Sequence, residues 1–166
     1  MAQLTNDLHD QYQRDGYLFF PSCFCEGEVD VLTAALPSLL EQPSDARVLE
    51  EHGRAVRAVH GFHLRDGIFA TLPRHPRLLM LAMAVLRGSV YVHQTKLNVK
   101  EACEGEVWPW HQDSIFWLQE DGLPSDDAVN VLIFLDEVTE FNGPLMVIPV
   151  AERCSCSNRA YGFCAV

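Results

Sequence analysis

The order of its hydrophobic patterns constrains the fold of this 166-residue chain most, because helical patterns dominate the first half and strand patterns the second. Apolar residues recur at helical spacing over 26–40, and Pro76 suits the first turn of another helix. Short apolar or alternating runs follow at 90–99, 128–135 and 145–148, and each has the length of a strand. This order predicts an α+β fold in which a helical layer covers one face of a β-sheet.

Shorter elements complete the first half of the chain. Thr5 is a suitable N-cap for a helix through Arg14, and Gly16 is suited to end that helix. Pro37 lies inside the predicted helix over 26–40 and should kink or split it, because proline lacks the amide hydrogen that a helix needs. The remaining predictions are a buried strand at 17–20, a hairpin joining 47–49 to 54–59, a short helix at 68–72, and an end to the Pro76 helix before Gly88.

Charge and hydropathy argue against several classes of partner. The net charge is −11 and the 12 basic residues are scattered, whereas a nucleic-acid surface needs clustered lysine and arginine. No apolar run reaches the roughly 18 residues of a membrane helix. The N-terminus lacks the basic region and apolar stretch of a secretory signal, so a cytoplasmic location is expected.

The six cysteines are expected to be reduced thiols, because disulfides are rare in the cytosol. Two C-x-C pairs occur, at 23–25 and 154–156, whereas zinc ribbons and redox proteins use C-x-x-C. A thiol or zinc-binding module built from the C-terminal cysteines stays open as an alternative.

A histidine and an aspartate stand two residues apart in the segment 107–113, which reads VWPWHQD. In an extended strand residues i and i+2 point to the same face, so His111 and Asp113 would converge on one cation. They would supply two of the three ligands of a 2-His-1-carboxylate iron site. A bare His-x-Asp pair is common by chance. Here tryptophans flank it, and EDGLP at 120–124 and FNGPL at 141–145 follow.

This larger pattern resembles the phytanoyl-CoA dioxygenase family of iron- and 2-oxoglutarate-dependent oxygenases, and within it members like ectoine hydroxylase and the leucine hydroxylases. The resemblance runs from about residue 5 to Pro149. It implies N-terminal helices packed on a partial double-stranded β-helix, or jelly roll, whose later strands are missing. It therefore divides the chain into an incomplete oxygenase domain at 1–149 and an atypical cysteine-rich tail at 150–166.

The resemblance also implies roles for individual residues. His111 and Asp113 would bind Fe(II) and be the catalytic residues, and an aspartate at 113 favours hydroxylation over halogenation. Gln94 and Asn98 would lie on one face of a strand, where amides can donate hydrogen bonds to a keto acid. The residues implied near 2-oxoglutarate are Gln94, Asn98, Trp108 and Asn130. The implied walls of the small-molecule pocket are Trp110 and Trp117.

The sequence departs from the family pattern after Asp113. The family takes a second histidine from a later strand and follows it with an arginine for 2-oxoglutarate. No histidine follows His111, and only Arg153 and Arg159 lie downstream. The third-ligand candidates are His60, His63 and His93, of which His93 is the poorest because it should face away from Gln94.

Two expectations for function follow from this departure. One is an Fe(II)- and 2-oxoglutarate-dependent dioxygenase that hydroxylates an amino acid or a natural-product intermediate. The other is a catalytically inactive, truncated fragment. Open sheet edges in such a fragment would favour self-association.

Overall fold

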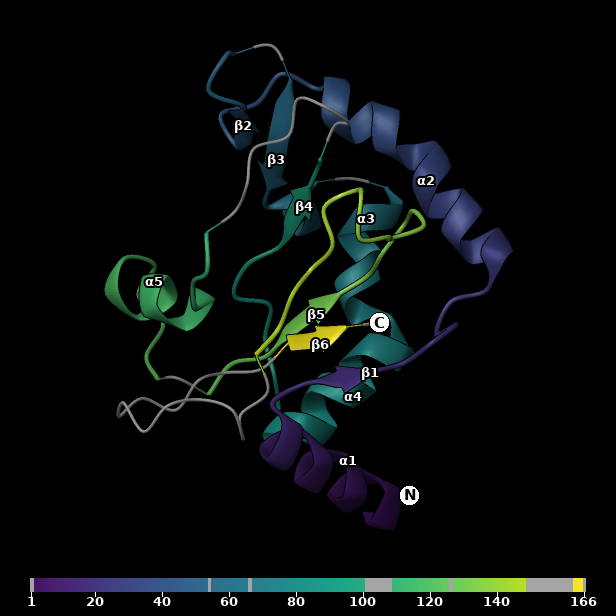
Figure 1. Cartoon of the computed structure of the whole chain (residues 1–166), viewed down its shortest axis with the longest axis vertical. Helices are drawn as coiled ribbons and strands as arrows, with labels where there is room; N and C mark the ends of the chain where they lie inside the picture. The colour runs from purple at the N-terminus through teal and green to yellow at the C-terminus, as the bar shows by residue number, and fades with distance from the viewer. Residues whose placement is uncertain are drawn as a thin grey trace.

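Helices pack at two places in the computed structural model, which describes residues 2–53, 55–65, 67–100, 109–125, 127–148 and 163–165. α1 (Ala2–Asp15) packs against α4 (Pro76–Leu86), and α2 (Glu26–Glu41) contacts α3 (Ile68–Thr71) and strand β3 (Val56–His60). Figure 1 shows α1 and α4 together near the N-terminus and α2 along the opposite end of the molecule. The predicted α+β class is confirmed.

The helix boundaries follow from local signals. α1 begins at Ala2, before the predicted cap, and ends at Asp15, just before Gly16, whose φ of 82° suits glycine. The Cys25 amide donates to the Glu28 carboxylate at 2.9 Å, which caps the start of α2. Pro37 lies inside α2 without splitting it.

The strands form two small sheets. β2 (Arg47–Leu49), β3 and β4 (Lys96–Asn98) form an antiparallel sheet in the order β2-β3-β4, and the predicted hairpin is confirmed. β1 (Leu18–Phe19), β6 (Phe163–Ala165) and β5 (Asn130–Leu132) form a parallel sheet in the order β1-β6-β5. Short 3-10 turns lie at η1 (Phe62–Leu64) and η2 (Leu72–Arg74).

The later strands are shorter than the sequence predicts. Within 90–99 only Lys96–Asn98 pairs, within 128–135 only Asn130–Leu132 pairs, and 145–148 forms no strand. A strand needs a neighbour that accepts its ladder of hydrogen bonds, and alternation of side chains does not provide one. The strand predictions over the remaining residues of these runs are therefore wrong.

The main hydrophobic core explains why one face of the antiparallel sheet is left for polar groups. Leu32, Leu39, Val59 and Phe69 are buried together, and Leu97 packs against them. Successive residues of a strand point to opposite faces. Lys96 and Asn98 therefore lie on the face of β4 opposite to Leu97 and the core. Helix α5 (Asp113–Gln119) stands to one side of this sheet in Figure 1.

A second cluster joins α1, α4 and the parallel sheet through Tyr12, Leu18 and Val85, with Val129 and Val131 packed against it. It fixes β5, and with it Asn130, relative to the helices. Within the part of the chain that the structure describes, no helix has the length and apolarity to cross a bilayer.

Candidate functional site

His111 and Asp113 converge, although not by the geometry that the sequence suggests. The prediction of an extended strand is wrong, because Gln112 caps a helix and Asp113 is the first residue of α5. The side chains nevertheless meet, with His111 Nε2 and Asp113 Oδ1 3.3 Å apart. Each side chain is about one-third exposed, at 32% and 33%, so the pair lies at the surface.

A neighbouring group orients each of these two side chains. The Nδ1 atom of His111 lies 2.7 Å from the carbonyl oxygen of Pro109. A carbonyl oxygen only accepts, so Nδ1 is the donor of this hydrogen bond, and Nε2 lies on the side of Asp113. Asn130 donates from Nδ2 to Asp113 Oδ2 at 2.6 Å, which leaves Oδ1 on the histidine side. Such outer hydrogen bonds are typical of metal-binding histidines and carboxylates.

Lys96 is a member of the site that the sequence interpretation missed. Burial lowers the pKa of Lys96, while the negative charge of Asp113 acts in the opposite direction. The ammonium group is thus partly withdrawn from water within electrostatic range of the predicted metal ligand. The alternation of Gln94, Lys96 and Asn98 along one strand face was the signal that could have found it.

The other predicted site residues are less closely associated with this pair. Asn98 lies on β4 and Gln94 just before it, and both are exposed. Trp117 is half-buried on α5, one turn after Asp113, whereas Trp110 is 62% exposed. Trp108 lies outside the described residues.

The candidate third ligands do not join the pair. The rings of His63 and His93 contact Thr95 and Trp117 respectively. His60 lies opposite Lys96 on the β3–β4 ladder, and burial is the main reason that its pKa is lowered. Over the described ranges, no three histidine, cysteine, aspartate or glutamate side chains lie close enough to share a metal ion.

The site therefore fits two ligands of a three-ligand iron centre. Imidazole nitrogen and carboxylate oxygen are the donor types of such a centre, and their separation lets both face one cation. Among the described residues, no third histidine, cysteine, aspartate or glutamate lies close enough to join the pair. Cys23 and Cys25 are free thiols, while residues 154 and 156 lie outside the described part, so the zinc alternative stays untested.

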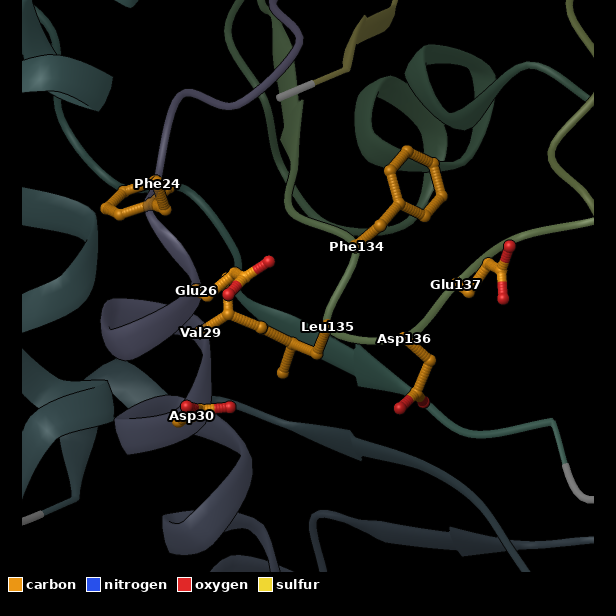
Figure 2. Close-up of a pocket in the computed structure, with 8 residues that line it drawn as sticks. All are labelled: Phe24, Glu26, Val29, Asp30, Phe134, Leu135, Asp136 and Glu137. Carbon is orange, nitrogen blue, oxygen red and sulfur yellow. The ribbon is translucent and has the colours of Figure 1, made fainter.

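A hollow of about 260 Å³ lies elsewhere, and Figure 2 shows its lining. It is formed by α2 and by the segment that follows β5. Its lining residues are Phe24, Glu26, Val29, Asp30, Phe134, Leu135, Asp136 and Glu137. None of them is a predicted site residue, and the four carboxylates would repel an acidic co-substrate.

Residues 12–153 match the phytanoyl-CoA dioxygenase family, and the chain belongs to it. Over 147 residues it is 48% identical to the L-proline trans-4-hydroxylase of Streptomyces griseoviridis. This alignment covers 89% of this chain and 55% of the relative. It is 35% identical over 154 residues to the ectoine dioxygenase of Bordetella parapertussis, covering 90% of this chain and 50% of that protein. The chain spans about half the length of these relatives.

The fold is also similar to a solved structure. The crystal structure of EctD from S. alaskensis with 2-oxoglutarate and 5-hydroxyectoine aligns with a TM-score of 0.66 at 30% identity. The alignment covers 75% of this chain and 44% of that one. A further EctD structure, with bound Fe, aligns with a TM-score of 0.61 over 70% of this chain.

Proposed function

We propose that this chain carries the His–Asp half of an Fe(II)- and 2-oxoglutarate-dependent dioxygenase that hydroxylates a small molecule. The observation that carries the proposal is the 3.3 Å approach of His111 Nε2 and Asp113 Oδ1, each held by a neighbouring hydrogen bond. Membership of the family supports it. The bound iron would supply the oxygen chemistry, in which 2-oxoglutarate becomes succinate and carbon dioxide while the substrate gains a hydroxyl group.

The residues of this chain would bind and orient the reactants. His111 and Asp113 would hold the metal, and Asn130 would keep the carboxylate turned toward it. Lys96 would attract a carboxylate of the co-substrate or substrate, since an ammonium group in partly buried surroundings binds anions well. Gln94, Asn98 and Trp108 stay proposed 2-oxoglutarate contacts, and Trp110 and Trp117 stay proposed pocket walls.

We infer that the substrate is a free amino acid, and L-proline is the first compound to test. The relative at 48% identity is an L-proline trans-4-hydroxylase, and the second relative is an ectoine dioxygenase. An indole such as Trp117 suits a small zwitterion, because its face attracts a cationic amine. Residues 1–149 would form the oxygenase domain on a jelly-roll plan, with 150–166 as a separate tail.

An inactive fragment is the second candidate, and a specific observation favours it. Within the described ranges the metal pair lacks a third protein ligand. Two ligands would hold iron more weakly than three. Exposed apolar side chains such as Phe141 (89%) and Met146 (64%) would favour self-association of such a fragment.

Anaerobic titration of the purified chain with Fe(II) and 2-oxoglutarate tests the proposal. An intact site gives the visible charge-transfer absorption of an iron–keto acid complex, and His111→Ala and Asp113→Ala abolish it. Air and L-proline should then yield succinate and hydroxyproline in equal amounts. The absence of both absorption and succinate in a monodisperse sample would contradict the dioxygenase proposal and favour the inactive fragment.

A further inference from the structure

Three aromatic rings connect the segment before β4 to helix α5. The ring of His93 meets the indole of Trp117 at a centroid distance of 6.0 Å and an interplanar angle of 63°. The ring of Tyr91 also meets the ring of His93, at 6.2 Å and 78°. Both pairs have the edge-to-face geometry that favours aromatic contact. His93 is therefore the ring that contacts both of the others.

Trp117 lies on the helix that begins at Asp113. Residues four apart on a helix lie one above the other on the same face, so the indole lies one turn from the predicted metal ligand. α5 has few contacts with the other helices and strands, and Figure 1 shows it standing to one side of both sheets. A contact that ties Trp117 to the body of the protein thus has a large effect on where the indole lies.

Hydrogen bonds hold the residues that follow His93 in place. Two residues later, Thr95 is buried at 9% exposure, and its hydroxyl lies 2.7 Å from His63 Nδ1. The carbonyl of Thr95 accepts a hydrogen bond from the Gly61 amide at 2.8 Å. The β3–β4 ladder begins at the next residue, Lys96. The segment that carries His93 is thus anchored although it is not itself a strand.

We propose that His93 is a positioning residue that holds the indole of Trp117 as one wall of the amino-acid site, with Tyr91 packed against His93. This inference rests on the proposed function for the nature of the ligand. His93 acts through its ring, which contacts the rings of both Tyr91 and Trp117. It has no part in holding the metal. Loss of the ring therefore weakens amino-acid binding and leaves the iron–2-oxoglutarate complex intact.

The test compares His93→Ala, His93→Gln and His93→Phe in the full chain. Fluorine NMR of fluorotryptophan-labelled protein reports the surroundings of Trp117, whose resonance is assigned with Trp117→Phe. Alanine and glutamine should shift and broaden that resonance, whereas phenylalanine, which keeps an edge-to-face ring, should leave it close to wild type. The KM for L-proline should rise about 3- to 10-fold with kcat nearly unchanged in the first two variants only.

His75→Ala is the matched control. His75 makes a similar ring contact, 5.2 Å from Phe24, but lies at the start of α4. Its removal should lower the melting temperature without moving the Trp117 resonance or the KM. This comparison separates positioning from a general loss of stability.

Added L-proline provides a binding measurement that needs no turnover. It should shift the Trp117 resonance in the wild type and in His93→Phe, and fail to do so in the alanine and glutamine variants. A glutamine variant that matches wild type in both resonance and response would overturn the inference, as would an unchanged resonance in both ring-deleted variants. A wild-type chain that shows the proline shift but no iron–keto acid absorption would retain the inference and refute the proposed function.

Discussion

Asn130 donates a hydrogen bond of 2.6 Å to Asp113 Oδ2 and so links β5 to the first residue of α5. The two residues are 17 positions apart, so the contact depends on the tertiary fold. It turns the other carboxylate oxygen toward His111, 3.3 Å from the imidazole Nε2. The orientation of the predicted metal pair thus depends on a strand that the second hydrophobic cluster holds in place.

Asn130→Ala should weaken Fe(II) binding by about 10-fold, the lower end of the effect of losing a partner that orients a metal ligand. The carboxylate of Asp113 would lose its amide donor and rotate more freely. Calorimetric titration with Fe(II) under anaerobic conditions measures the change. Asn6→Ala, at an exposed position of α1, is the control and should bind iron as the wild type does. Equal affinities for both variants would show that Asn130 does not orient the ligand.

Glu50→Ala should destabilise the fold by about 3 kcal/mol. The Glu50 side chain is only 2% exposed and forms an ion pair with Arg57 Nη1 at 2.9 Å. Removal of the carboxylate takes this ion pair away from the side chain of Arg57, which is only 19% exposed. Urea unfolding gives the free energy of unfolding. Asp15→Ala breaks the exposed pair with Arg14 and should leave that free energy nearly unchanged.

The helices follow from the sequence more closely than the strands do. Caps and breakers such as Gly16 and Pro76 act on residues nearby in the chain, so the C-terminal end of α1 and the start of α4 could be predicted. A strand depends on a distant partner, and over 90–99 only the three residues that pair with β3 form one. The apolar runs therefore predict strands that are longer than those in the structure.

The approach of His111 and Asp113 could be predicted from the sequence, but the geometry that produces it could not. The spacing of His111 and Asp113 suggested a shared face of a strand, yet a turn into α5 brings them together. Lys96 escaped notice because a lysine on an alternating strand is usually a solvated residue. Only the fold shows that Leu97 packs into the core, which leaves Lys96 on the opposite face of β4, where the charge of Asp113 acts on it.

Acid should destabilise α2 through Glu28. Hydrogen bonds from Arg77, and then from the Cys25 amide, lower the pKa of Glu28 from 4.5 to about 2. A carboxylate with a pKa lowered by folding stabilises the folded state fully above about pH 4.5, and this contribution is lost as the pH falls through about 2. Glu28→Gln should therefore lower the melting temperature at pH 6 and change it little near pH 2.

Melting temperatures measured by circular dichroism between pH 2 and pH 7 would check this prediction. Glu26→Gln removes a negative charge from the same first turn of α2. It therefore serves as the control for the interaction of such a charge with the helix dipole. A Glu28 variant whose melting temperature tracks the wild type in parallel at every pH would contradict a role for its ionisation.

Lys96→Ala should weaken the binding of a carboxylate ligand about 10-fold, because a charge-assisted hydrogen bond in partly buried surroundings is lost. Lys96→Arg keeps the positive charge and should restore much of the affinity. Two separate titrations decide which ligand Lys96 contacts. The iron charge-transfer absorption measures the binding of 2-oxoglutarate, and the Trp117 resonance measures the binding of L-proline. Lys100→Ala removes an exposed charge from the same segment and should change neither affinity. If Lys96→Ala binds both compounds normally, the ammonium group contacts neither ligand, and its proximity to Asp113 only balances charge within the folded chain.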